Sequence, residues 1–286
     1  MDAFGKSAQL TPTLSFADAF ATVQHERADH AIIPIENSSN GSVVQTLDLL
    51  ANRNGLYNDI EVCGEYYLTV HHCFMARSGS TGPPAYDAIT KIYTHPQAWG
   101  QCETFLNKHF KGVERQDVSS TSKAAEIVAN DTTECSGAIA SRFAAEYHGV
   151  DILEENIEDR ADNTTRFLIL MNAHSERSGR LSLQQLTDAS VSKSSSEALK
   201  TLILFTVNHD SPGALADALA VFKDHGMNLT SINTRPSQKR AWQYVFFVEC
   251  QRVPTPQNEE AVSRVLRSLQ QVTETCRYLG TWRDRL

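Results

Sequence analysis

The 286-residue sequence predicts an α/β fold followed by a smaller ferredoxin-like unit. Short β-rich runs alternate with amphipathic helical patterns in the first part, and the order β-α-β-β-α-β follows in the second. Between the two parts, the segment 173–199 loses its hydrophobic periodicity and ends in a serine-rich run, as linkers do. We therefore expect one domain at 1–172, a linker at 173–199 and a second domain at 200–286.

The elements of the first part follow from local patterns. Phe16, Phe20 and Val23 lie at helical spacing behind Ser15, which is a typical N-cap. Pro96 predicts the start of a helix that runs through Leu106, because proline favours the first helical turn. The other expected elements are strands at 31–35, 66–76, 91–93, 113–116, 137–140 and 167–170, helices at 43–50, after Ser120 and at 143–147, a turn at Asn40-Gly41 and a loop at 78–84.

The second part has clearer signals. Apolar residues alternate along its first predicted strand, and a helix with Leu215, Leu219 and Phe222 on one face is stopped by Gly226, a residue typical of helix C-termini. The expected elements are a strand at 201–207, a helix at 213–224, strands at 229–234 and 244–250, a helix at 260–270 and a strand at 277–279. This order is that of a ferredoxin-like unit.

Charge and composition argue against several classes of function. The 26 Lys and Arg residues face 34 Asp and Glu, so the net charge is −8, which makes nucleic acid and anionic membranes poor partners. The sequence has no run of 18 apolar residues and no secretory signal, so a cytoplasmic location is the default expectation. Glycine-rich phosphate-binding motifs are absent, and we expect no nucleotide cofactor.

The cysteines and histidines give little support for a metal site. The six cysteines include no CxxC pair, which fits free thiols in a reducing compartment. His71-His72-Cys73 combines two ligand types, but adjacent strand residues point to opposite faces, so strand packing is the favoured interpretation. We expect no metal, and we interpret Cys102 and Cys135 as small buried hydrophobic residues.

Uncharged polar clusters follow four of the predicted strands, at the position where α/β sheets bind ligands. Each has a simple structural explanation when it is taken alone, such as a helix cap at Ser120. The clusters are Pro34–Gly41 (PIENSSNG), Thr94–Gln97 (THPQ) with Gln101, Ser119–Ser122 (SSTS) and Asn163–Phe167 (NTTRF).

Taken together and in this order, the four clusters resemble the motifs of the prephenate dehydratase family. The family's PIEN-S-x-x-G, [ST]HPQ-A-x-x-Q-C and TRF motifs match Pro34–Gly41, Thr94–Cys102 and Thr165–Phe167. The C-terminal part is similar to the ACT regulatory domain, with Gly213-Ala214-Leu215 at the GAL position and Asn228-Leu229-Thr230 leading into Thr234-Arg235-Pro236. The resemblance implies two lobes of the periplasmic-binding-protein type II kind, with the active site between them.

The resemblance also implies an activity, which is the cofactor-free conversion of prephenate to phenylpyruvate in L-phenylalanine biosynthesis. Thr165 would hydrogen-bond the leaving hydroxyl, and Asn37, Thr94 and Gln101 would supply directional hydrogen bonds. Substrate contacts are expected from Glu36, Ser38, Gln97, Thr121, Arg166 and Phe167. Two roles stay open: Arg166 either grips a substrate carboxylate or forms a structural ion pair, and Glu36 is either catalytic or structural. Gln97 is expected near Gln101 on one helix surface.

For the second domain, the resemblance implies L-phenylalanine as a feedback effector and a homodimer or homotetramer. A purely dimerising module is the alternative. The expected effector-binding residues are Gly213, Ala214, Leu215, Asn228, Leu229, Arg235 and Pro236. Asn233 stands where many relatives have glutamate, which leaves the effector less certain.

One family motif is not found. The N-terminal GPxGT[YF]S segment is absent, and Met1–Lys6 is similar to the end of the helix that follows it, so we expect the chain as written to lack one wall of the pocket. This favours a catalytically silent, phenylalanine-sensing binding protein as the alternative function. Intact Asn37, Gln101 and Thr165 favour the enzyme, and arogenate is an alternative substrate.

Overall fold

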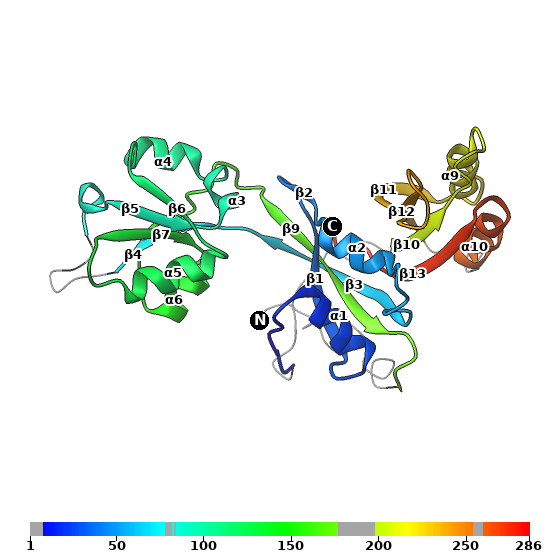
Figure 1. Cartoon of the computed structure of the whole chain (residues 1–286), viewed down its shortest axis with the longest axis horizontal. Helices are drawn as coiled ribbons and strands as arrows, with labels where there is room; N and C mark the ends of the chain where they lie inside the picture. The colour runs from blue at the N-terminus through cyan, green and yellow to red at the C-terminus, as the bar shows by residue number, and fades with distance from the viewer. Residues whose placement is uncertain (1–7, 78–81, 83, 177–197, 254–259) are drawn as a thin grey trace. The chain divides into compact units, whose positions relative to one another are not determined.

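The computed structural model describes residues 8–77, 82, 84–176, 198–253 and 260–286. The chain forms two compact units, of which unit 1 comprises Met1–Leu68 and Thr165–Leu286 and unit 2 comprises Thr69–Thr164 (Figure 1). Most of the predicted loop 78–84 and of the predicted linker 173–199 lies outside the described residues.

The first sheet of unit 1 has the strand order β2-β1-β9-β3. β1 pairs antiparallel with β9, and the predicted turn at Asn40-Gly41 leads from β1 into β2. Ser15 caps α1 as expected, because its hydroxyl oxygen accepts a hydrogen bond from the Asp18 N–H. The elements are α1 (Phe16–Gln24), β1 (His30–Asn37), β2 (Gly41–Ser42), α2 (Val44–Ala51), β3 (Ile60–Thr69) and β9 (Thr164–Asn172).

The second sheet of unit 1 confirms the predicted βαββαβ order, with the spatial order β11-β12-β10-β13. Both of its helices pack on one face of the sheet (Figure 1). Gly226 adopts a φ of +69° directly after the end of the first helix, which is why the helix stops there. The elements are β10 (Leu199–Thr206), α9 (Ala214–Asp224), β11 (Asn228–Pro236), β12 (Tyr244–Arg252), α10 (Ala261–Val272) and β13 (Thr275–Arg283).

Strand β10 is buried on both faces, and this joins the two sheets of unit 1. Ile203 and Phe205 pack against α9 and α10, whereas Leu202 and Leu204 belong to the core that contains residues of the first sheet such as Leu168. Because successive strand residues point to opposite faces, a strand with two buried faces needs a continuous apolar run. β10 has such a run from Leu202 to Phe205, and not the alternation expected from the sequence. The second domain and the first sheet therefore share one hydrophobic core.

The shared core includes one close backbone approach. Gly280 in β13 has a φ of +133°, and a Cβ atom added to it would lie 2.0 Å from the carbonyl oxygen of Val62 in β3. Glycine is required here both by the backbone conformation and by the space.

Unit 2 contains a five-stranded sheet with the order β6-β5-β7-β4-β8. β5 pairs in parallel with β6 and β7, and β4 pairs antiparallel with β7 and β8. The elements are β4 (Cys73–Ala76), the 3₁₀ helix η1 (Tyr86–Ala88), β5 (Lys91–Thr94), α3 (Pro96–Trp99), α4 (Glu103–His109), β6 (Glu114–Asp117), α5 (Thr121–Asn130), β7 (Ser136–Ala140), α6 (Arg142–His148) and β8 (Asp151–Glu155).

Three predictions for this part of the chain need correction. The helix expected from Pro96 to Leu106 is two helices, because α3 ends at Trp99 and α4 begins at Glu103, where the Asp159 carboxylate accepts from the N–H groups of Glu103 and Thr104. The strand expected at 66–76 is divided between β3 and β4. Strand β8 was not predicted.

Candidate active site

Strands β1 and β9 bring Asn37 and Thr165 together. The two residues are register partners, and the Asn37 Nδ2 atom donates to the Thr165 hydroxyl oxygen at 3.0 Å. The orientation of the Asn37 amide is fixed because its Oδ1 atom accepts from the backbone N–H groups of Ser39 and Asn40, each at 3.0 Å. Thr165 therefore accepts from Asn37, and its own O–H proton is oriented away from this bond. This leaves the hydroxyl as a directed donor on a partly exposed residue.

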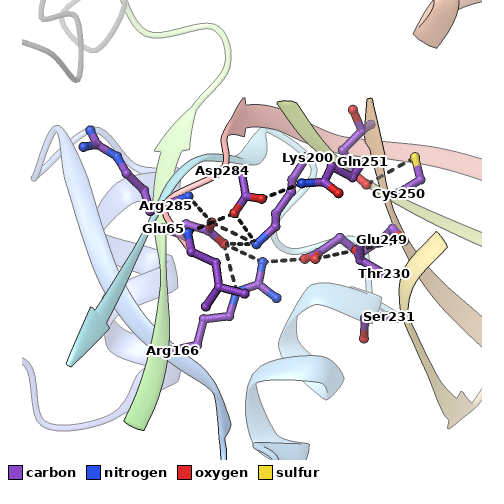
Figure 2. A network of polar contacts seen from close by, with 12 residues as sticks. Glu65, Arg166, Lys200, Thr230, Ser231, Glu249, Cys250, Gln251, Asp284 and Arg285 are labelled. Atoms are coloured by element: carbon purple, nitrogen blue, oxygen red, sulfur yellow. Dashed lines mark hydrogen bonds and ion pairs between the residues drawn. The ribbon is translucent and has the colours of Figure 1, made fainter. Parts of the chain in front are cut away.

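Arg166 lies beside Thr165 but points into a buried cluster of charges (Figure 2). Its Nε and Nη2 atoms donate to Glu65 at 2.9 and 2.6 Å, and Nη2 also donates to Glu249 at 2.5 Å. Burial acts to lower the pKa of Arg166, but the carboxylates of Glu249 and Glu65 outweigh burial and raise it above its ordinary value. The guanidinium is thus held by two protein carboxylates.

Of the two roles expected for Arg166, this geometry favours the structural ion pair. The residue is only 9% exposed, and its contacts match the structural ion pair that was the other open interpretation. A bidentate grip on a substrate carboxylate would require the guanidinium to leave Glu65 and Glu249.

Lys200 and Asp284 complete the buried cluster. The Lys200 ammonium lies 3.1 Å from Glu65 and 2.7 Å from Asp284, and the Arg285 N–H donates to Glu65 at 2.9 Å. Burial again acts to lower the pKa of Lys200, and its carboxylate partners raise it above its ordinary value. In the core of unit 1, the cations of Arg166 and Lys200 therefore lie among three carboxylates, those of Glu65, Glu249 and Asp284.

In unit 2, Thr94 occupies the end of β5 but faces inward. Its side chain is fully buried, and its hydroxyl donates to the carbonyl oxygen of Ile139 at 2.8 Å. The Thr94 hydroxyl proton thus joins β5 to β7, and the substrate contact expected of this residue stays a prediction.

Gln101 lies in the turn between α3 and α4, where His72 contacts it. The His72 Nε2 atom lies 2.7 Å from the Gln101 Oε1 atom, and the Gln101 carbonyl accepts from the Asp159 N–H at 2.7 Å. His72 is buried, whereas Gln101 is partly exposed. With Nε2 of His72 donating to Oε1, the amide N–H groups of Gln101 are directed away from the ring.

Contrary to the expectation, Gln97 and Gln101 do not belong to one helix. Gln97 is an exposed residue of α3, and α3 ends before Gln101 is reached. The Gln97 N–H donates to the His95 Nδ1 atom at 3.3 Å, so His95 caps this short helix.

The other expected substrate contacts occupy strand ends and turns. Glu36 pairs in register with Ser42 and Arg166, and Phe167 pairs with Pro34. Ser38 is exposed in the turn after β1, and Thr121 is the first residue of α5, behind Ser120, whose hydroxyl accepts from the Lys123 N–H. The cap predicted at Ser120 is thus confirmed.

The described residues include no group of three or more His, Cys, Asp or Glu that is placed to hold a metal. His71 and His72 lie between β3 and β4 and not on the strand that had been predicted; His71 contacts Glu158, and Cys73 is buried in β4. Cys102 is fully buried, and burial raises the pKa of its thiol, as expected for a small hydrophobic residue.

The expected effector-binding residues divide into two groups. Gly213, with a φ of +86°, is the N-cap of α9, and the partly exposed Ala214 and Leu215 are its first two residues. Asn228 and Leu229 are exposed at the start of β11. Arg235 and Pro236 are instead engaged with α2 and the residues after it. The Arg235 guanidinium binds both oxygens of Asp48, and the Pro236 carbonyl accepts from Arg53. Those two contacts join the second domain to α2 and the residues after it, and the effector role expected of Arg235 stays a prediction.

Sequence reasoning missed His72, Glu65 and Glu249. The only local signal for His72 is that it is a polar residue in a β-rich run, and the sequence suggests metal binding as the one function to consider for it. Glu65 and Glu249 lie 101 and 83 residues from Arg166 in the chain, so no local pattern links them.

Comparison with known proteins agrees with these motifs. Residues 1–175 match the prephenate dehydratase family and residues 201–267 match the ACT domain. The bifunctional chorismate mutase/prephenate dehydratase of Aquifex aeolicus is 36% identical, over 99% of this chain and 68% of its own length. The prephenate dehydratase of Methanocaldococcus jannaschii is 34% identical, over 90% of this chain and 83% of its own length.

A solved structure has the same overall fold. The prephenate dehydratase of Arthrobacter aurescens in complex with L-Phe has a TM-score of 0.75 and 26% identity, over 95% of this chain and 80% of its own. Against several of the bifunctional relatives, the chain spans only 60% to 68% of their length. Within the described residues, no helix is both long enough and apolar enough to cross a bilayer.

Proposed function

The chain belongs to the prephenate dehydratase family, and we propose that it converts prephenate to phenylpyruvate. The observation that supports this most directly is the oriented pair in unit 1, in which Asn37 donates to Thr165 and leaves the threonine O–H as a donor. A directed neutral donor suits a reaction whose main requirement is help for a departing hydroxyl group.

The reaction needs little from the protein because forming an aromatic ring supplies its driving force. The electron pair of the bond to the ring carboxylate moves into the ring as carbon dioxide leaves. The electron pair of the carbon–oxygen bond departs with the hydroxyl, which takes up one proton and becomes water. No electron acceptor takes part, so the residues must hold the substrate and deliver one proton.

We assign the leaving hydroxyl to Thr165. A threonine hydroxyl is too weak an acid to be the final source of the proton, so it donates a hydrogen bond to the leaving oxygen and relays a proton from water. Asn37 fixes the direction of this donation. Such proton-transfer help typically contributes about 10²–10⁴-fold in rate.

Gln101 of unit 2 is the second group we assign to the substrate, through the amide N–H groups that His72 leaves available. Glu36, Ser38, Gln97, Thr121 and Phe167 are proposed as surrounding contacts. Two carboxylates on the substrate call for N–H donors, which amides and backbone groups provide.

The test is Thr165→Val, which nearly preserves volume and removes the hydroxyl. Turnover of prephenate, followed as phenylpyruvate, should fall by about 10²-fold or more. The free energy of unfolding should change by only about 1–2 kcal/mol, because one partly exposed hydrogen bond is lost. Thr165→Ser, which keeps the hydroxyl, is the matched control and should retain most of the turnover. Near-normal turnover in Thr165→Val would remove this residue from the mechanism.

The wild-type assay also separates the alternatives. A silent phenylalanine-sensing protein would bind L-phenylalanine without converting prephenate. An arogenate dehydratase would convert arogenate with a higher kcat/KM than prephenate. Both substrates should therefore be compared with the same preparation of protein.

We propose that the second domain makes the activity responsive to L-phenylalanine. The effector carboxylate would bind the free N–H groups at the start of α9, and Asn228 and Leu229 would contact the rest of the ligand. We further propose a homodimer or homotetramer and a cytoplasmic location. Titration of L-phenylalanine into the activity assay tests the regulation, and light scattering tests the assembly.

A further inference from the structure

The ACT domain contributes a charged side chain to the cluster beside Thr165. Glu249 is in β12, and its Oε2 atom accepts from the Arg166 Nη2 atom at 2.5 Å (Figure 2). Arg166 directly follows Thr165 in β9. The residue that Glu249 holds is therefore the chain neighbour of the threonine. Glu249 is 5% exposed, which makes this contact part of the core.

The other carboxylate oxygen of Glu249 contacts the strand that carries two of the proposed effector residues. Its Oε1 atom accepts from the Thr230 hydroxyl at 2.8 Å. Thr230 follows Asn228 and Leu229 in β11, and it is the extra residue of a β-bulge, because Leu229 pairs with Cys250 and Ser231 with Glu249. A bulge re-aims the side chain of its unpaired residue, here onto Glu249.

We propose that Glu249 is a positioning residue for Thr165, and that the Thr230 contact lets an effector bound beside Asn228 and Leu229 change the orientation of the threonine. This inference rests on the proposed function. The contacts run from Thr230 to Glu249, from Glu249 to Arg166, and through the β9 backbone to Thr165, whose hydroxyl meets Asn37. All of these residues belong to unit 1.

Two features make this cluster suitable for coupling. Glu65 holds Arg166 from the first sheet and Glu249 holds it from the ACT sheet, so the guanidinium has two carboxylate partners on different elements. If β11 shifts and Thr230 moves away, Glu249 loses one hydrogen-bond donor. The relative strength of the contacts that Glu249 and Glu65 make with Arg166 then changes. Buried charges respond strongly to the loss of one partner, because water is not present to replace it.

The experiment compares three full-length variants with the wild-type chain. Glu249→Gln keeps the shape and removes the charge that holds Arg166. Thr230→Val removes the hydroxyl that donates to Glu249 and leaves Arg166 untouched. Asp284→Asn is the matched control, because it is the same type of change in the same buried cluster. Its carboxylate binds Lys200, Gln251 and the Leu286 N–H, and no ion pair joins it to Arg166.

Four quantities are measured for each protein: kcat, KM for prephenate, the L-phenylalanine concentration that halves activity, and the dissociation constant of L-phenylalanine by calorimetry. Glu249→Gln should lower kcat by about tenfold or more with KM nearly unchanged, because a misdirected Thr165 weakens the transition state selectively. Thr230→Val should keep kcat and bind L-phenylalanine, but need at least about fivefold more of it for half-inhibition. Asp284→Asn should keep both kcat and the response.

The inference is overturned if Glu249→Gln has the kcat and the half-inhibition of Asp284→Asn. If Glu249→Gln does not fold, Thr230→Val decides, and an unchanged response there overturns the coupling. If the wild-type chain converts no prephenate, the proposed function fails, and hydrogen exchange of the β9 amides replaces the activity assay. L-Phenylalanine should then alter β9 exchange in the wild type and not in Thr230→Val, and a wild type that shows no such change contradicts the inference.

Discussion

Replacing Arg166 with methionine separates the two roles that the sequence left open for it. Methionine has a similar length and no charge, so it fills the space without holding Glu65 or Glu249. The Glu65 side chain is 0% exposed and the Glu249 side chain 7% exposed. Their negative charges would remain buried, with Lys200 as the cation nearest to Glu65.

The size of the effect follows from this burial. Removing one partner of a buried ion pair costs about 3–5 kcal/mol, because it leaves an uncompensated charge. For a domain of this size, each kcal/mol corresponds to about 2–4 °C in the unfolding temperature. We therefore expect Arg166→Met to unfold roughly 6–20 °C below the wild type. Adding Glu249→Met should restore part of the loss, since it removes one of the stranded charges.

Thermal unfolding followed by tryptophan fluorescence measures this, because Trp282 is buried in the shared core of unit 1. Prephenate kinetics below the unfolding temperature complete the comparison. If Arg166→Met unfolds at the wild-type temperature and its KM for prephenate rises more than tenfold, Arg166 grips the substrate and our reasoning from the ion pairs is wrong.

Three further predictions concern packing, pH and the orientation of Gln101. Gly280→Ala should lower the free energy of unfolding by more than the roughly 1–3 kcal/mol of backbone strain alone, because its Cβ would meet the Val62 carbonyl. Urea unfolding measures this, and Gly112→Ala is the control, because Gly112 has a φ of +85° and open space around it and so gives the strain without the collision. Equal losses of unfolding free energy in the two variants would contradict the prediction. Burial acts to raise the pKa of Asp284, but the bond to Lys200 outweighs it and holds that pKa below its ordinary value. The stability that this bond contributes is present above about pH 4 and is lost as the pH falls through the folded pKa. The urea midpoint of Asp284→Asn should therefore change less than that of the wild type between about pH 5 and pH 2. His72→Leu should lower kcat about tenfold with a smaller change in KM, since the Gln101 amide loses its fixed direction, and steady-state kinetics with unchanged kcat would refute this.

The sequence predicted the elements of unit 1 well because their signals are local. Ser15 caps its helix through a residue three positions away, and Gly226 ends α9 through its own backbone conformation. The βαββαβ order follows from apolar periodicity of the same short range. Helix caps and apolar periodicity both depend on residues that lie within a few positions of the element they predict.

Local patterns did not predict the contacts that some polar residues make with distant parts of the chain. Thr94 has the residue type and position of a ligand contact, yet its hydroxyl is taken by Ile139, which lies 45 residues away. The helix expected through Leu106 is interrupted before Gln101, where the partners are His72 and Asp159 from other elements. Local patterns predict the strand or helix in which a polar residue lies, but not which distant group its side chain contacts.

The shared core of unit 1 changes how experiments on the ACT domain are interpreted. Deleting residues 198–286 would remove Leu202 and Leu204 from the core and leave Arg166 and Glu65 without Glu249 and Lys200. The remaining first sheet would then expose apolar surface and carry a broken charge cluster, and both would lower its stability. A loss of activity after such a deletion would therefore report the loss of structure as much as the loss of regulation. Single changes at Thr230 and Asp284 separate the two effects, because each alters the contacts of one side chain and leaves the shared core in place.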